Sequence, residues 1–222
     1  KDALDESDLP FLVDLHVWNE VPEKFREIIR QEYVVLQVAG QVEGSRVAGD
    51  VRPFGELFAE PTRNGLTRPK AVRGSGIKMV NMGELFAYPR LRNVPMDRVP
   101  LSDSEAERFL LADGDLLFAR QSLVLEGAGK CSIFLEDSEP VTFESHITRV
   151  RLDPDKGDPR YYFYYLQSHH GRAAIRSIVE QGAGASGIRG SDLQALSVQW
   201  RPINEQRAIA HILGTLDDKI EL

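Results

Sequence analysis

Two glycine-rich stretches are the first places where this sequence could hold a nucleotide phosphate. Residues 182–187 read GAGASG and match the G-x-G-x-x-G pattern of dinucleotide-binding turns. Such a turn needs a strand before it and a helix opening at its end, whereas a helical pattern precedes these glycines. The stretch GAGKCS has Cys131 and Val124 where a phosphate-binding loop requires Ser or Thr and its first glycine. We therefore expect no nucleotide at either stretch, and read the first as a surface loop that can approach another molecule closely.

Acidic residues, histidines and the single cysteine form no complete catalytic group. The D/E-x-K ending of a restriction-type nuclease centre occurs only at Asp217 and Lys219, on a predicted terminal helix. Metal-ligand spacing is missing among His16, His146, His169, His170 and His211. Cys131 could act as a nucleophile with His146 as base, but a lone cysteine in an apolar strand is more often a buried small hydrophobe. The prediction is no catalytic residue, no metal and no cofactor. The acidic group Glu136, Asp137 and Glu139 reads as a solvated turn.

Composition sets the class of protein. Of 222 residues, 42% are hydrophobic and 27% are charged, which is enough to bury a core and excludes wholesale disorder. No apolar run approaches the roughly 18 residues that a membrane span needs, and one cysteine excludes an internal disulfide. These features predict a cytoplasmic protein without a membrane partner.

Charge is distributed unevenly along the chain, whose formal net charge is −7. Residues 1–60 carry six basic and thirteen acidic side chains, and residues 101–145 carry three and ten. Residues 61–100, the basic block, carry eight basic side chains and only two acidic ones. A local excess of this kind attracts polyanions, although a run of charge is usually just a solvated face.

Two parts with different patterns meet near Asp50. Residues 21–32 predict a short amphipathic helix and residues 33–42 a strand, and glycines then break the chain. Beyond this point, short apolar runs predict strands at 54–58, 77–80, 116–118, 132–135, 147–152 and 196–199. Helices are predicted from Ser102 or Ser104 to Arg108, from a cap at Asp158 to residue 165, and over 172–180. Without a regular βαβ rhythm, the fold class is α+β with a mixed, twisted sheet.

The last segment predicts a long helix of the coiled-coil type, with Asn204 as its N-cap. Ile209, Leu213, Leu216 and Ile220 follow one another at the spacings of a coiled-coil seam. Two heptads are fewer than the three or four that establish a coiled coil, and an ordinary core-facing helix fits the same pattern. Since the pattern still runs where the chain stops, and the chain starts at Lys1, we expect a fragment of a longer protein.

Six motifs follow one another from residue 51 onward. They are PFGELF at 53–58, GSGIKMVNMGELF at 74–86, LADGDLLFAR at 111–120, PRYYFYYLQS at 159–168, GAGASGIRGSDL at 182–193 and RPINEQRAIAHILGTLDDKIEL at 201–222. In this order they resemble the DNA-specificity (S) subunit of type I restriction-modification enzymes. The chain departs from the family at Gln121, Ser122 and Leu123, where a small residue and glycine are common, and at Asn204, where proline is usual.

The resemblance implies a DNA reader without catalysis of its own. Residues 51–201 would be one target-recognition domain and residues 202–222 the start of a conserved helix, while residues 1–50 have no assigned role. A full S subunit has two such domains, each reading half of a bipartite target, joined by helices that pack as a coiled coil. The implied partners are double-stranded DNA, the methyltransferase (M) subunit and the restriction (R) subunit. The chain would be a half-subunit, a truncated piece, or a short S protein that pairs with itself through the helix.

Two groups of side chains would then contact DNA. Sequence-independent phosphate contacts would come from the basic block, through Arg63, Arg68, Lys70, Arg73, Lys78, Arg90 and Arg92. Base readout would come from Arg120, Gln121 and Ser122, because arginine pairs with guanine and glutamine with adenine. Lys130 and Arg189, each beside glycines, are second candidates. For each arginine the alternative is a surface charge that keeps the protein soluble.

Two other functions stay open. One is the DNA-recognition part of a single-chain type II-like restriction-modification enzyme, whose catalytic part would lie in or before residues 1–50. The other is an interaction protein that uses only its terminal helix.

Overall fold

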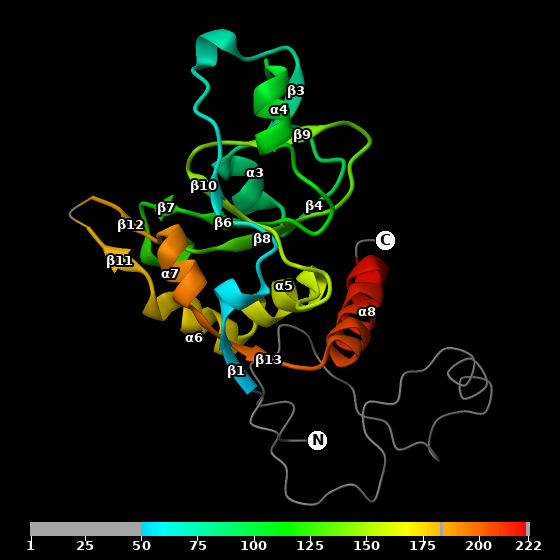
Figure 1. Ribbon diagram of the computed structural model, residues 1–222. Coiled ribbons are helices and arrows are strands. Elements are labelled where there is room, and N and C mark those ends of the chain that lie inside the picture. Colours follow the sequence, from blue (N-terminus) through cyan, green and yellow to red (C-terminus); the bar gives the residue numbers. More distant parts are fainter. Residues whose placement is uncertain (1–49, 183, 221–222) are drawn as a thin grey trace, which may run out of the picture. The chain divides into compact units, whose positions relative to one another are not determined.

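The computed structural model describes residues 50–182 and 184–220 (Figure 1). The chain divides at Asp50 into two units, and the described residues after Asp50 all belong to the second. The predicted helix at 21–32 and strand at 33–42 lie outside the described residues. The roles assigned to residues 1–50, 51–201 and 202–222 stay predictions.

A five-stranded sheet forms the centre of the described unit. Its strand order is β2-β10-β6-β8-β4, with β2 (Arg63–Asn64), β4 (Arg90–Leu91), β6 (Leu116–Ala119), β8 (Cys131–Phe134) and β10 (Ile147–Val150). Neighbours are antiparallel except β4 and β8, which are parallel. The short apolar runs predicted the three central strands to within two residues at each end.

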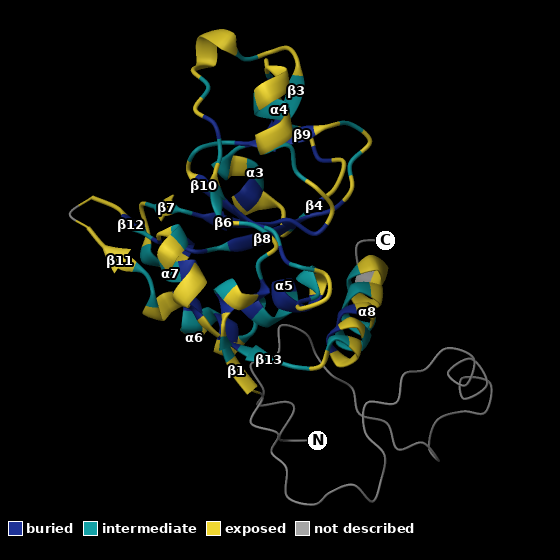
Figure 2. Ribbon diagram, viewed as in Figure 1, coloured by how far each residue is buried: buried dark blue, intermediate teal, exposed yellow. Residues whose placement is uncertain are grey.

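The central strand β6 is buried on both faces (Figure 2). Leu116 and Phe118 enter one hydrophobic cluster, while Leu117 and Ala119 enter another. Successive side chains of a strand point to opposite faces, so other elements must cover both sides of the sheet. This double burial explains why the run is apolar throughout and does not alternate with polar residues.

Helices gather mainly on one face of the sheet. The first cluster lies between the sheet and η2 (Phe54–Leu57), α5 (Pro159–Gln167), α6 (His169–Ser177), α7 (Gly190–Ala195) and β13 (Ser197–Trp200). The second cluster lies under α3 (Met82–Ala87) and β9 (Val141–Phe143). The last helix, α8 (Ile203–Ile220), packs beside α5 (Figure 1). Helices and strands mingle as the α+β prediction requires.

Three smaller sheets surround the core. One has the order β5-β3-β9, where β3 (Ile77–Val80) is antiparallel to β5 (Asp97–Val99) and parallel to β9. A second has the order β11-β12-β7, built from β11 (Glu180–Gln181), β12 (Ser186–Gly187) and β7 (Gln121–Ser122). The third pairs β1 (Asp50–Pro53) with β13. Short 3-10 turns occur at η3 (Lys70–Val72) and η4 (Leu125–Gly127).

Capping residues fix where the helices begin. α4 (Asp103–Phe109) starts after Ser102, whose cap includes a reciprocal bond with Glu105, as the sequence predicted. α5 starts after Asp158, whose carboxylate accepts the amide of Tyr161 at 2.9 Å, again as predicted. α6 starts at His169, three residues before the predicted Arg172, because the hydroxyl of Ser168 accepts the amide of Gly171.

Several predictions of local structure were wrong. The run 54–58 is the 3-10 turn η2 and not a strand; it buries Phe54 and Leu57, which a regular strand would point to opposite faces. Asn204 is not the N-cap of the last helix. The carbonyl of Pro202 accepts the amides of Glu205 and Gln206, so the helix begins at Ile203. Helices α3 and α7 were missed, although Asn81 and Glu84 form a capping box before α3.

No helix in the described part of the chain is both long enough and apolar enough to cross a membrane.

Candidate nucleic-acid interface

Most of the charge of the basic block is paired with carboxylates within the fold. Arg68 donates to Glu105 at 2.6 Å, and Arg73 lies 3.2 Å from Asp97 while it also donates to the side chain of Asn81. The acidic residues come largely from the segment that follows the block in the sequence. Two regions of opposite charge in the chain therefore neutralise each other in space.

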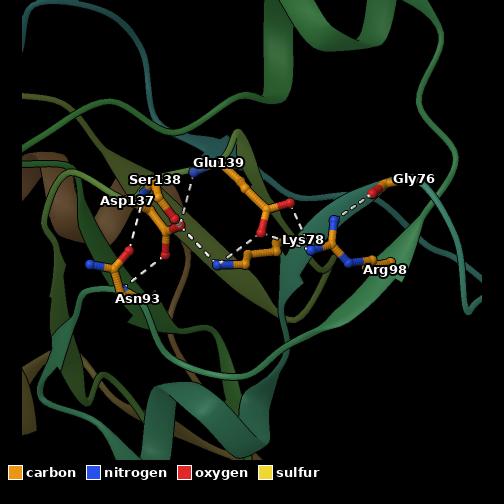
Figure 3. A network of polar contacts seen from close by, with 7 residues as sticks. All are labelled: Gly76, Lys78, Asn93, Arg98, Asp137, Ser138 and Glu139. Atoms are coloured by element: carbon orange, nitrogen blue, oxygen red, sulfur yellow. Dashed lines mark hydrogen bonds and ion pairs between the residues drawn. The ribbon is translucent and has the colours of Figure 1, made fainter.

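Lys78 is the clearest case (Figure 3). Its ammonium lies 2.9 Å from Asp137 and 3.5 Å from Glu139, and its side chain is only 12% exposed. Arg98 holds the other side of Glu139 at 2.7 Å and donates to the carbonyl of Gly76. The hydrogen bond to Asp137 raises the pKa of Lys78. The predicted phosphate contact is thus occupied by an internal ion pair.

The same network corrects the expectation of a solvated acidic turn. The side chain of Asp137 is fully buried and accepts the backbone amides of Asn93 and Glu139 at 2.9 and 3.1 Å. Burial opposes its ionisation, but the bond from Lys78 and these amides outweigh that effect, so the pKa of Asp137 is lowered. The turn is therefore tied to the β5-β3-β9 sheet through Lys78 of β3.

The remaining members of the basic block divide into three kinds. Arg63 is half-buried, with its guanidinium 5.6 Å from the ring centre of Phe109. Arg90 pairs with Asp218 of α8. Lys70 and Arg92 are exposed, and neither lies within ion-pair distance of a carboxylate among the described residues.

A polar cleft beside α8 collects several arginines. It has a volume of about 390 Å³, and its lining includes Arg90, Arg92, Arg160 and Arg207. Arg160 is bridged to Asp113 at 3.0 Å, and Arg207 donates to the carbonyl of Pro154 at 3.1 Å. Arg92 is the member of this set best placed to meet an external phosphate.

The predicted base readers lie on the edge sheet β11-β12-β7. Gln121 is exposed and pairs in register with Gly187, and Ser122 pairs with Ser186. A side chain at Gly187 would clash with the carbonyl oxygen of Arg120, 3.0 Å from its Cβ position, so glycine lets the two strands meet. The base readers and the glycine-rich stretch, separate candidates in the sequence, therefore form one surface.

The other candidate readers are partly engaged within the protein. Arg120 is half-buried and donates to the carbonyl of Ser145 at 3.2 Å. Arg189 is exposed and pairs with Glu180 at 2.5 Å. Lys130 donates to the carbonyl of Phe86 at 2.7 Å. Gln121 and Arg189 are the exposed predicted readers, and of these two Arg189 is held in an ion pair.

Sequence reasoning missed two further cations beside this surface, Arg172 and Arg176 of α6. Arg172 donates to the carbonyl of Glu126 at 3.4 Å, in the turn η4 that comes shortly after β7. Burial and the charge of Arg172 together lower the pKa of Lys130. Within residues 50–182 and 184–220, no carboxylate lies within ion-pair distance of Lys130, Arg172 or Arg176. The only signal in the sequence was a helical segment with arginines four residues apart.

Two exposed apolar side chains were also missed. Leu123 is 89% exposed and Val124 is 59% exposed. They border an open groove of about 560 Å³ that is also lined by Met82, Phe86, Gln121 and Ser122. Their position directly after the predicted readers was the signal available in the sequence.

The terminal helix α8 rests on α5 through small and polar side chains. Gln206 and Ala210 are buried, and Gly214 passes close to the hydroxyl of Tyr164. That hydroxyl donates to Asp217 at 2.7 Å, and burial together with this bond raises the pKa of Tyr164. The residues of α8 that face the domain therefore recur every three or four positions. They form a stripe different from the predicted seam.

The predicted seam is divided between two environments. Ile209 packs against the first hydrophobic cluster, Leu213 is half-buried, and Leu216 is 43% exposed. The side chain of Ile220 lies outside the described residues. Part of the seam thus belongs to the core, and part of it points outward; the coiled coil stays a prediction.

The described residues contain no group of three or more His, Cys, Asp or Glu side chains placed to hold a metal ion. Cys131 is 3% exposed and packs in the first cluster, as its apolar strand predicted, and burial raises the pKa of its thiol. Asp217, the acidic residue of the D/E-x-K sequence, accepts a hydrogen bond from the hydroxyl of Tyr164.

Known proteins similar to this chain include specificity subunits of type I restriction enzymes. Residues 93–222 match the family "Type I restriction modification DNA specificity domain". The specificity subunit of the type I restriction enzyme EcoKI from Escherichia coli is 30% identical over 69% of this chain and 33% of its own length. The StySPI specificity subunit of Salmonella potsdam is 24% identical over 86% of this chain and 41% of its own length.

Solved structures show the same fold. A crystal structure of the HsdS subunit from Thermoanaerobacter tengcongensis aligns with a TM-score of 0.53 and 15% identity, covering 82% of this chain and 40% of that one. A structure from a study of complex assembly in a type I restriction-modification system aligns at 0.57 and 15% identity, over 82% and 41%. The chain spans between a third and two fifths of the length of the curated relatives it matches. Because the family match covers more than half of its residues, this chain belongs to the type I restriction-modification DNA specificity family.

Proposed function

We propose that this chain recognises one half of a bipartite DNA target as a specificity subunit of a type I restriction-modification system. One observation carries the proposal beyond the family itself: the exposed Gln121 lies on an edge sheet beside cations that have no carboxylate partner in the described part of the chain. A glutamine side chain can read adenine through two hydrogen bonds, and cations beside it can hold the phosphates.

Phosphate contacts follow from which cations the fold leaves available. We assign them to Lys130, Arg172 and Arg176 beside the edge sheet, with Lys70 and Arg92 as further contacts from the basic block. Arg63, Arg68, Arg73, Lys78 and Arg90 have a mainly structural role in this proposal, because each is engaged or half-buried within the domain. Arg120, Ser122 and Arg189 support readout around Gln121.

Assembly is assigned to α8. Its outward position Leu216, together with Leu213 and Ile220, would pack against a second conserved helix or against a second copy of this chain. We further propose that the helix binds the M subunit and through it the R subunit, in the cytoplasm, and that the chain itself has no catalytic activity. The relatives are specificity subunits, which favours this function over the single-chain type II-like enzyme.

Selection from a random duplex library with the purified 222-residue chain tests the proposal. We expect enrichment of one short sequence. Gln121→Ala should change the enriched bases, whereas Gln194→Ala, an exposed glutamine on α7, should leave them unchanged. A failure to enrich any sequence would contradict the proposal. Turnover with magnesium and S-adenosylmethionine by the chain alone would favour the enzyme instead.

A further inference from the structure

Leu123 is the most exposed large hydrophobic side chain among the described residues, at 89%, and its neighbour Val124 is exposed to 59%. Leaving such side chains in water forgoes the free energy that their burial would release. Scattered exposed apolar residues need no explanation, but contiguous ones mark binding surfaces. These two are contiguous with each other and with the groove beside α3.

The groove joins apolar and polar chemistry within a few residues. Met82, Phe86, Leu123 and Val124 supply apolar walls, while Gln121 lies on the same lining. Gln121 of β7 and Leu123, in the bend that follows it, both line this groove, so one ligand can contact them together. A ligand that fits this pair offers hydrogen-bonding groups and a small apolar group next to each other.

Charge indicates the class of that ligand. The ammonium of Lys130 lies 5.2 Å from the ring centre of Phe86, a residue of the groove wall. Arg172 donates to the carbonyl of Glu126, shortly after Val124, and Arg176 follows one helical turn later. None of the three has a carboxylate partner among the described residues, although the whole chain carries a net charge of −7. Cations beside an apolar groove favour a polyanion that also carries apolar groups.

The major groove of DNA presents such a combination. An A·T pair shows the N6 and N7 groups of adenine beside the C5-methyl group of thymine, and apolar side chains contact that methyl. We propose that Leu123 and Val124 bind the C5-methyl group of a thymine in the half-site, in the same pair that Gln121 reads or in the next one. The inference rests on the proposed function and makes Leu123 a specificity-determining residue.

Replacing thymine by uracil tests this directly, since the exchange removes only the C5-methyl group and keeps base pairing. Each thymine of the selected duplex is replaced in turn, and affinity for the 222-residue chain is measured by fluorescence anisotropy. For the unchanged protein we expect one position where uracil weakens binding about fourfold, which corresponds to about 0.8 kcal/mol for a buried methyl group. Leu123→Ala should discriminate clearly less than fourfold between the thymine and uracil duplexes.

Val72→Ala is the matched control, because Val72 is an apolar side chain 44% exposed on η3. It should keep the full fourfold discrimination. Circular dichroism of Leu123→Ala should match the unchanged protein, since the side chain is almost wholly in solvent.

The outcomes separate the two proposals. If a sequence is selected but no thymine position responds to uracil, or Leu123→Ala discriminates as well as the unchanged protein, the methyl contact is overturned while DNA recognition stands. If no sequence is selected, both are overturned. If Leu123→Ala abolishes binding to a purified M subunit and leaves DNA affinity unchanged, the groove is a protein-docking surface and the methyl contact is again overturned.

Discussion

Charge along the sequence ranks the basic block above the edge sheet as a candidate for phosphate contacts. The cations that have no carboxylate partner in the described residues rank the two regions in the opposite order. The basic block has the larger excess of cations in the chain, yet Arg68, Arg73 and Lys78 are all paired with carboxylates. Strand β7 of the edge sheet lies in a segment that reads as acidic, yet Lys130 beside it has no carboxylate partner in the described residues. An excess of cations along a chain segment can therefore be neutralised by carboxylates that folding brings beside it. The cations that remain without carboxylate partners are the ones available to an external polyanion.

The largest effect should come from breaking the ion network of the basic block. Asp137→Ala leaves Lys78 nearly buried without its main partner, and such a loss costs about 3 kcal/mol of unfolding free energy. Urea denaturation measures it. Glu136→Ala, an exposed neighbour, is the control and should change stability by about 0.5 kcal/mol at most. Equal stability of the two variants would contradict a structural role for Lys78.

The edge-sheet cations should dominate sequence-independent DNA affinity. Changing Lys130, Arg172 and Arg176 together to alanine should reduce the slope of log affinity against log salt by about 0.9 for each phosphate that is no longer bound. The triple change Arg68→Ala, Arg73→Ala and Lys78→Ala should leave the slope nearly intact in protein that remains folded. If the slope decreases only in the variant with Arg68, Arg73 and Lys78 changed, the basic block and not the edge sheet supplies the phosphate contacts.

Gln121→Ala should change preference and not general affinity. Removing a bidentate hydrogen-bonded pair with adenine costs about 1–3 kcal/mol on the selected site, while binding to unrelated duplexes stays the same. Competition anisotropy with selected and scrambled duplexes distinguishes the two. A uniform weakening on both would mean that Gln121 does not read bases.

Acid should weaken the ion pairs of the basic block. Hydrogen bonds from Ser102 and Arg68 lower the pKa of Glu105 to about 2, and the pKa of Asp137 is also lowered. A carboxylate with a lowered pKa contributes stability above its unfolded pKa, and that contribution disappears as pH falls through the folded pKa. The urea concentration at the unfolding midpoint should thus decrease as the pH is lowered from about 4 to about 2. Glu105→Gln should flatten this fall; an unchanged profile would argue against the pairing.

The smallest effect on folding should come from the outward position of α8. Leu216→Asp should change the unfolding free energy by about 0.5 kcal/mol at most, because Leu216 is 43% exposed, but should weaken any self-association seen by sedimentation. Global unfolding of this variant would place Leu216 in the domain core.

Local features of the fold were largely predictable. Ser102 and Asp158 indicated two helix starts because capping depends on side chains within three residues of the helix end. The buried strand β6 was visible as a continuous apolar run. The turn η2 was misread as a strand, since a short apolar run with Phe54 and Leu57 fits either form until its packing partners are known.

The site was predictable in part. Gln121 was predicted as a base reader from its chemistry and its place after a strand; the structure shows that it is exposed, and its role stays a prediction. The pairing of Lys78 with Asp137 joins residues far apart in the chain, and so does the meeting of β7 with β12. Such contacts depend on the completed topology and leave no local pattern. Arg172 and Leu123 became candidates for the site only once the structure showed which elements lie beside β7.

The edge sheet has a consequence for how this protein can evolve. Its strand β7 contributes neither Gln121 nor Ser122 to the two buried hydrophobic clusters, and the loop that follows leaves Leu123 in solvent. Substitutions at these positions remove no core packing, so selection can exchange them without first restoring stability. With the readout proposed for Gln121, single substitutions here would change the target sequence while the same scaffold persists.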